Sequence, residues 1–451
     1  MGQATGFGRL AAGVFTAGLM LSANAAAAQT MIHVAPGGDD RNPGSAARPV
    51  KTLPRAQALV RDHNRRDDVI VEIAGGVYRL DQPLVFKAAD GGQGDHSVIW
   101  RAKDADRPVV SGGFDVSGFT LFDEDRRIYV ADLPKGLDAR QVWVNDTLAE
   151  RPWLEIRHSD VSFTATGLQI TNPDLAFIGS LQHPERLEIE ATGFFTDRFS
   201  PVASISGTTL TMQQPAWDNN TWGYDTISKP IFPDDSRLFL VNAPELIGKT
   251  NDWHAKPYQW FIDPKAGKLY LRIAQDDDIA RLRVTIPALP ALMSISGTPE
   301  APIRNLSFGG LRFSYTSWMG PSESTGYANQ QSGAFLKDVS SIRPADAWSS
   351  CGWGCPEFES MRQLWHQIPA AVQVAAARNI VFENNHFTQL GQIALGLGNE
   401  ANANLSGVGL AVQDVRVSRN HFGVLSGSAI MAGGAPPLAA SARVALSSVA
   451  A

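Results

Sequence analysis

The chain has 451 residues and a formal net charge of −6, with both signs of charge dispersed along its length. This length is enough to bury a large core, and the lack of a Lys- and Arg-rich run argues against a nucleic-acid partner. The basic pair Arg65 and Arg66 is followed at once by Asp67 and Asp68. Such a mixture indicates a solvated surface.

The first 28 residues have the pattern of a cleavable secretory signal. Arg9 precedes an apolar stretch from Leu10 to Leu21, and small residues follow as far as Ala28. We expect cleavage near Ala28 and a secreted or periplasmic protein. A membrane anchor is the alternative, but the apolar stretch is shorter than the roughly 20 residues that span a bilayer. We therefore expect no membrane span in the mature chain.

One amphipathic helix is predicted in residues 29–115. Thr52 can cap its first turn, and Pro54 suits an early helical position. Its apolar stripe consists of Leu53, Ala56, Leu59 and Val60. A stack of parallel strands has an open end that must be covered, so we expect this helix to cap the first coils of such a stack.

Short strands then recur between turns, as in the alternating residues Val69, Val71 and Ile73 before Gly75-Gly76. This rhythm is typical of a solenoid. Residues 116–295 break it, because they are richer in Trp, Pro and charge. We predict a β-rich insertion there, with strands in QVWVND, RLEIEA, RLFLVN, KLYLRI and RLRVTI.

Two later segments, ARNIVFENNHFTQLGQIAL and VQDVRVSRNHFGVLSGSAI, align at a spacing of 35 residues. The matched pairs include Ile380 with Val415, Phe382 with Val417, Asn385 with Asn420, and His386 with His421. An earlier segment, IRNLSFGGLRF, has the same frame 74 residues before the first, a distance of about two repeats.

Each repeat predicts a coil with Ile, Val, Phe and Leu inward and an Asn that bonds to the coils above and below. The recurring histidines are expected to have a structural role at the turn. We predict an all-β chain, a right-handed parallel β-helix solenoid with an N-terminal capping helix and a β-rich insertion. Further coils should occupy residues 296–434, with an excursion at about 318–370. A leucine-rich horseshoe is the alternative, but the repeats lack closely spaced leucines and a regular helix.

Several segments carry a resemblance to a known family: APGGDDRNPGSAARPVKTLPRAQ, IAGGVYRLDQPLVF, GLRFSYTSW and ARNIVFENNHFTQLGQIALGLG. Over most of residues 31–434 the chain is similar to glycoside hydrolase family 141, whose members are secreted, pectate-lyase-like β-helices and include α-L-fucosidases and xylanases. The resemblance implies a carbohydrate substrate. Family members are longer, and their catalytic carboxylates lie on later coils. The tail at 435–451 has lost the repeat frame, which favours a truncated product over a terminal cap.

A glycosidase needs two carboxylates, about 5 Å apart for retention or roughly 6.5 to 9.5 Å apart for inversion. Glu383 follows the inward-facing Phe382 and should point outward. Asp338, Glu357 and Glu359 lie on the excursion, where binding groups are often found. These four residues are the candidate catalytic carboxylates, and a solvated surface role is the alternative for each.

Four tryptophans surround the excursion: Trp318, Trp348, Trp353 and Trp365. An exposed indole can stack on a sugar ring, so these residues are candidates for substrate binding. The alternative is that they attach the excursion to the solenoid through packing.

The two cysteines, Cys351 and Cys355, are expected to form a disulfide that closes a short loop, because the predicted export permits one. Free thiols are the alternative. A metal site is disfavoured because only His366 lies nearby in sequence. We expect no metal and no cofactor, since no phosphate-binding loop or nucleophile turn occurs.

The sequence therefore predicts an exported carbohydrate-active β-helix protein that is glycoside-hydrolase-like, acts on a polysaccharide or oligosaccharide, and is inactive if truncated. One alternative is a non-catalytic glycan-binding or surface β-helix protein. The other is a polysaccharide lyase, which would need a cation and a base. The loop DDRNPG could supply calcium ligands from Asp39, Asp40 and Asn42, but it is more simply a turn.

Overall fold

The structure is a computed structural model that describes residues 29–105, 107–249, 256–329, 333–337, 342–351, 355–361, 365–398 and 410–433. The predicted signal segment, Asp338, Trp353 and the predicted tail at 435–451 lie outside these residues. Among the described residues, no helix combines the length and the apolar character that crossing a membrane requires.

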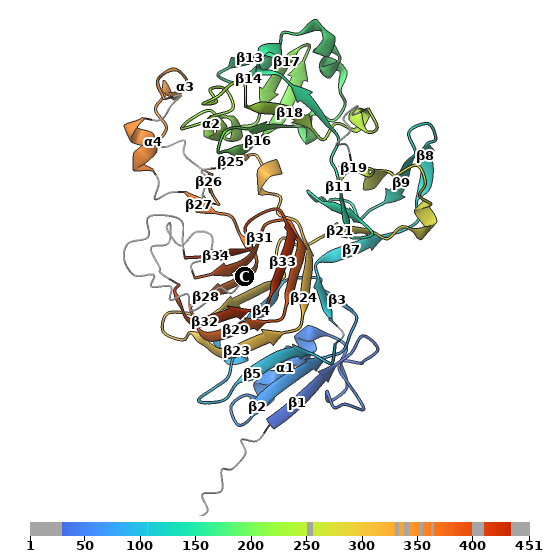
Figure 1. The fold of residues 1–451 in the computed structure, drawn as a ribbon, viewed down its shortest axis with the longest axis vertical. Coiled ribbons are helices and arrows are strands. Elements are labelled where there is room, and N and C mark those ends of the chain that lie inside the picture. Colours follow the sequence, from blue (N-terminus) through green and yellow to red (C-terminus); the bar gives the residue numbers. More distant parts are fainter. Residues whose placement is uncertain are drawn as a thin grey trace, which may run out of the picture.

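The described chain is mostly β, and its centre is formed by three parallel sheets (Figure 1). The first parallel sheet contains β1 (Gln29–Val34), β2 (Asp68–Ile73), β5 (Val98–Ala102), β23 (Ile303–Gly309), β29 (Ala377–Glu383) and β32 (Val412–Ser418). The second contains β3 (Val77–Arg79), β6 (Val109–Ser111), β24 (Arg312–Thr316), β30 (His386–Leu390) and β33 (His421–Leu425). The third contains β4 (Leu84–Phe86), β22 (Met293–Ser296), β28 (Ala370–Ala375), β31 (Ile393–Leu397) and β34 (Ile430–Ala432).

From β2 onward the chain visits the first, second and third parallel sheets in that order and then returns to the first. One such circuit is called a coil here. The core lies between the three sheets and contains stacked rings, with Phe387 between Phe313 and Phe422 at centroid distances of 4.9 Å on both sides. Each coil therefore buries its apolar side chains against the coils on either side of it.

The register of the coils matches the alignment of the repeats. Ile380 pairs with Val415 on β32, and Leu306 pairs with Ile380. Because β23 is hydrogen-bonded directly to β29, the expected distance of about two repeats between these segments was wrong. The 74-residue separation is one coil that the excursion lengthens.

Asparagines connect successive coils at the turn between the first and second sheets. Asn385 is fully buried, and its side chain accepts a hydrogen bond from the backbone N–H of Leu311 (3.0 Å) and donates one to the carbonyl of Phe308 (2.9 Å). Asn420 accepts a hydrogen bond from the backbone N–H of Asn385 (2.8 Å) and donates one to the carbonyl of Phe382 (2.8 Å). The predicted role of the repeated Asn is thus what the structure shows.

Replacing this amide leaves backbone groups of the neighbouring coil without partners. We expect Asn420→Ala to lower the free energy of unfolding by about 1–3 kcal/mol, measured by chemical denaturation. The exposed Gln413 on the same coil provides the control, and Gln413→Ala should change stability by no more than about 0.5 kcal/mol. Equal effects of the two substitutions would show that the hydrogen bonds of Asn420 to the neighbouring coil do not stabilise the fold.

The predicted helix is α1 (Leu53–His63), and the hydroxyl of Thr52 accepts a hydrogen bond from the backbone N–H of Arg55 (3.2 Å). Its predicted apolar stripe is buried against β1 and β2. Asp40 accepts hydrogen bonds from the backbone N–H groups of Lys51 and Thr52, which makes the DDRNPG loop a turn that supports the start of the helix.

The strands between β6 and β22 form three antiparallel sheets. One is formed by β7 (Gly113–Val116), β10 (Val142–Val144), β11 (Thr147–Ala149) and β21 (Val284–Pro287), and another by β8 (Thr120–Asp123), β9 (Ile128–Asp132), β19 (Gln259–Asp263) and β20 (Lys268–Arg272). The third, called the insertion sheet here, contains β12 (Trp153–Ile156), β13 (Val161–Thr164), β14 (Gly167–Ile170), β15 (Glu188–Thr192), β16 (Asp197–Ser206), β17 (Thr209–Met212) and β18 (Arg237–Val241). All five predicted strand motifs overlap strands of these sheets.

The excursion adds strands to the insertion sheet. β25 (Tyr327–Asn329) pairs with β16, and β26 (Ala334–Leu336) and β27 (His366–Gln367) follow it. Both the insertion and the excursion leave a coil after the second parallel sheet and return to it at the third. Figure 1 shows the insertion sheet and the excursion together on one side of the parallel sheets.

Candidate functional site

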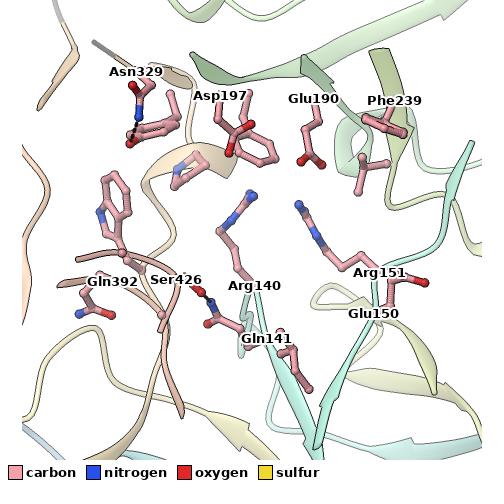
Figure 2. Close-up of a pocket in the computed structure, with 18 of the residues that line it drawn as sticks. Arg140, Gln141, Glu150, Arg151, Glu190, Asp197, Phe239, Asn329, Gln392 and Ser426 are labelled. Atoms are coloured by element: carbon pink, nitrogen blue, oxygen red, sulfur yellow. Dashed lines mark hydrogen bonds between the residues drawn. The ribbon is translucent and has the colours of Figure 1, made fainter. Parts of the chain in front are cut away.

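A cavity of about 800 Å³ lies between the insertion sheet and the parallel sheets. One wall is a face of the insertion sheet, and another is formed by the turns that follow β30 and β33, including Gln392 and Ser426. Residues 140–151 and the start of the excursion complete the lining. Figure 2 shows these segments around the opening. The site therefore combines parts of the chain that are far apart in sequence.

Strand alternation places acidic and aromatic side chains on the cavity face of the insertion sheet. Glu190 on β15 pairs with Phe199 on β16 and with Phe239 on β18. Residues two apart on a strand point to the same face, so Glu188 and Asp197 share the face of Glu190. The pairing of Phe199 with Tyr327 continues this face onto β25.

A buried ion triad stands behind the cavity. Glu188 is 3 % exposed, and its carboxylate accepts a hydrogen bond from Arg140 Nη1 (2.8 Å) and lies 3.0 Å from Arg151 Nη1. The hydroxyl of Ser322 also donates to it. Burial alone would raise the pKa of Glu188, but the two guanidinium charges and these hydrogen bonds outweigh burial and lower the pKa to about 2. Glu188 is therefore a permanent anion at neutral pH.

Two other carboxyls in the cavity behave in the opposite way. Burial, and then the charge of Glu190, raise the pKa of Asp197 to about 7. Burial also raises the pKa of Glu190, although Arg151 and Arg140 oppose it. In Figure 2, Asp197 and Glu190 point from the insertion sheet toward Arg140. Asp197 Oδ1 is buried and has no hydrogen-bond partner among the described residues.

These properties define what the cavity can do chemically. A carboxyl with a pKa near 7 is protonated in a large fraction of molecules at neutral pH, so Asp197 can donate a proton to a bound ligand. Glu190 is a second carboxyl close enough to affect it electrostatically. Pairs of titratable groups with shifted pKa values in a cleft are typical of catalytic sites.

Aromatic rings line the same cavity. Trp318 is partly exposed and packs edge-on against Tyr327 (5.7 Å between centroids) and Phe335 (5.3 Å). Trp153 packs edge-on against Phe239 at 5.5 Å. Trp318 is thus the predicted sugar-binding tryptophan that the structure brings to the cavity.

The other described tryptophans of that group make packing contacts away from the cavity. Trp348, at α3 (Ala347–Ser350), stacks on Trp217 at 6.5 Å. Trp365 is 8 % exposed and lies against Phe358 in α4 (Pro356–Ser360). These contacts match the alternative given for the tryptophans in the sequence, in which they pack the excursion against the rest of the protein.

Asp338 lies outside the described residues, and the three described carboxylates among the predicted four do not line the cavity. Glu383 forms an ion pair with Arg419 and accepts a hydrogen bond from Ser418 (3.2 Å), so it connects neighbouring coils. Glu357 and Glu359 lie on α4 and do not line the cavity. Sequence reasoning missed Glu190 and Asp197. The only signal was the alternation of acids in RLEIEA, where a strand places both glutamates on one face.

A disulfide joins Cys351 and Cys355 beside the exposed Glu357. Because the two sulfurs are bonded to each other, neither is a thiolate that could bind a metal. His366, the other residue considered in the sequence, lies on β27 with its ring against Phe335. The described part of this region therefore has the character of a structural loop.

Comparisons with known proteins fit the architecture. No family model matches the chain, and no curated protein matches it. A solved structure described as a glycoside hydrolase has a TM-score of 0.64 and 24 % sequence identity, and the match covers 81 % of this chain and 63 % of that one. A complex of XylC with xylose has a TM-score of 0.36 and 12 % identity, covering 88 % and 62 %. The first likeness shows a shared fold, and this chain spans less than two thirds of that structure.

Proposed function

We propose that the chain is a carbohydrate-active protein of the glycoside-hydrolase-like kind, whose three parallel sheets form a right-handed β-helix and whose cavity binds a polysaccharide or oligosaccharide. The observation that carries the proposal is the pair of partly buried carboxyls with raised pKa values, Glu190 and Asp197, in an open cavity lined by aromatic rings. The cavity volume of about 800 Å³ falls within the range of ligand sites. The solved structure that shares the fold is a glycoside hydrolase, which supports a glycoside substrate.

In the proposed reaction, protonated Asp197 donates its proton to the glycosidic oxygen as the bond from that oxygen to the anomeric carbon breaks. Ionised Glu190 is the second carboxylate, which stabilises the positive charge that develops on the sugar ring. Water then supplies the hydroxyl group of the new reducing end and the proton that restores Asp197. Glu188 remains ionised and holds Arg140 and Arg151 in place.

A non-catalytic glycan-binding protein is the second candidate, and the partly exposed ring of Trp318 favours it independently of the carboxyls. A ring of this kind offers an apolar face to a sugar whether or not a bond is cleaved. The two candidates predict the same binding site and differ in turnover.

Both candidates are tested by binding. We expect Trp318→Ala to weaken binding of neutral oligosaccharides, found by screening a glycan panel, by about tenfold in isothermal titration calorimetry. Phe122, which is 57 % exposed and lies outside the cavity, provides the matched control, and Phe122→Ala should leave affinity unchanged. Unchanged affinity in the Trp318 variant, with folding intact, would place the glycan elsewhere.

Export is a further part of the proposal. The pattern of Arg9, the apolar stretch and Ala28 supports it, although these residues lie outside the described structure. The Cys351–Cys355 disulfide is consistent with an oxidising compartment. Fractionation of producing cells with N-terminal sequencing tests it, and a new terminus near Gln29 is the expected result.

A further inference from the structure

A second cavity, of about 370 Å³, lies on the outer face of the second parallel sheet and shares no lining residue with the first. Its floor is formed by β3, β6 and β24, and its side by β7 and β21 of the insertion. Three guanidinium groups reach into it, from Arg79, Arg283 and Arg312. We call it the arginine groove.

Positive charge exceeds negative charge in the arginine groove. Arg79 is paired with Asp115, while Arg283 and Arg312 share Asp146. Two carboxylates therefore neutralise only part of the positive charge of three guanidinium groups. The side chains of Arg79 and Arg283 are 47 % and 46 % exposed, so both can contact a ligand from solution. This excess is local, because the whole chain carries a net charge of −6.

The strand register places two histidines beside Arg312, just outside the cavity. Arg312 on β24 pairs with His386 on β30, and His386 pairs with His421 on β33. Side chains paired in this way stand in one row across the sheet, perpendicular to the strands. Burial, and then the charges of Arg107, His421 and Arg312, lower the pKa of His386, which favours the neutral form of this imidazole. The strands β24, β30 and β33, about 4.8 Å apart, spread these three side chains over roughly 10 Å.

Repeated backbone geometry sets the edge of this row. Tyr315, Gln389 and Val424 occupy equivalent places in three coils and all have a positive φ, of 64°, 54° and 55°. Because the conformation recurs in three successive coils, it is a shared feature of these coils. In the first of these coils it brings the Tyr315 hydroxyl to Asp146, and in the second it allows Gln389 to accept a hydrogen bond from Arg312 (2.7 Å). The arginine side chains are thereby held in place.

We propose that the arginine groove binds an anionic saccharide, a short stretch of glycan that carries carboxylate or sulfate groups. Guanidinium groups bind such oxyanions through paired, charge-assisted hydrogen bonds. The groove offers no exposed ring for stacking a nucleobase, since its aromatic lining residue, Tyr315, is 3 % exposed. The cluster of three guanidinium groups matches closely spaced acidic groups on such a glycan.

The test uses the full chain and calorimetric titration with an oligogalacturonate, a heparin-derived oligosaccharide and a neutral xylo-oligosaccharide of similar length. We expect at least one anionic probe to bind more tightly than the neutral one. Arg79→Gln and Arg312→Gln should each weaken that binding by about tenfold and reduce its dependence on salt. The preferred probe distinguishes carboxylate from sulfate recognition.

Two control variants separate this site from the rest of the surface. Arg41, which is 90 % exposed on an N-terminal turn, provides the matched charge control, and Arg41→Gln should leave anion affinity unchanged. Trp318→Ala should also leave it unchanged, because Trp318 lines the other cavity. Equal binding of charged and neutral probes, or anion binding that survives both arginine substitutions in folded protein, would overturn the proposal. Loss of anion binding in the Trp318 variant alone would overturn it as well.

Discussion

Asp197→Asn is expected to lower the rate of glycan hydrolysis by about 10²–10⁴-fold, the usual contribution of a positioned acid. Asn has nearly the same shape as Asp but holds no transferable carboxyl proton. The measurement is the initial rate of reducing-end release from a glycan that the wild-type protein cleaves. Glu155, 44 % exposed on the same sheet and outside the cavity lining, provides the control. Glu155→Gln should retain the wild-type rate.

The pH dependence of the rate follows from the same carboxyl. Burial raises the pKa of Asp197 to about 7, so the acid form is lost, and the rate should fall, as the pH rises through about 7. Burial likewise raises the pKa of Glu190, which must be ionised, so the rate should also fall at acidic pH. A variant at Asp197 with wild-type activity and an unchanged alkaline limb would refute the assignment.

Stability gives an independent check that the Asp197 variant is folded. Because its pKa is raised in the folded state, the contribution of Asp197 to stability is fully present below its unfolded pKa and is lost as pH rises through about 7. Asn does not titrate. The stability of Asp197→Asn relative to the wild type should therefore increase between acidic pH and pH values above 7, measured by chemical denaturation.

Glu188→Gln is expected to lower the free energy of unfolding by about 3–5 kcal/mol at neutral pH, because it leaves Arg140 and Arg151 buried without their carboxylate. Guanidinium denaturation measures this loss. The control is again Glu155→Gln, which breaks an exposed pair with Arg237 and should cost less than about 1 kcal/mol. Similar losses in the two variants would mean that the triad contributes no more than a surface ion pair.

The pH dependence of that loss has a definite sign. Arginine charges and hydrogen bonds overcome burial and lower the pKa of Glu188 from 4.5 to about 2. Its contribution to stability is present above pH 4.5 and is lost as the pH falls toward 2. The difference between wild type and Glu188→Gln should therefore shrink in that window. A difference that is constant from neutral to acidic pH would show that the loss comes from packing.

The repeating coils could be predicted from the sequence because each one contains the same short pattern of residues. The frame of Phe382, Asn385 and Phe387 recurs in the next coil, and a recurring pattern of apolar residues and Asn reports directly on stacking. The helix Leu53–His63 was predictable for a similar reason, since Thr52 and the apolar stripe lie within one short segment. Strands in the insertion were also found, because alternation is a local signal.

The pairing of the excursion with the insertion was not predictable. Tyr327 lies opposite Phe199 across a gap of more than a hundred residues, and no repeat or local pattern specifies that contact. The same difficulty explains the wrong estimate of two repeats between β23 and β29. A sequence distance cannot distinguish an extra coil from one coil interrupted by a long excursion.

The sequence by itself determined the strands, the repeats and the helix Leu53–His63, because each depends on residues close together in the chain. Only the tertiary structure decided the candidate site. Asp197 and Glu190 acquire raised pKa values through burial by segments from distant parts of the chain. Glu188, on the same strand as Glu190, stays ionised because Arg140 and Arg151 fold against it. The chemistry of these carboxyls therefore comes from the folded environment, which the three acidic residues do not encode in their own local sequence.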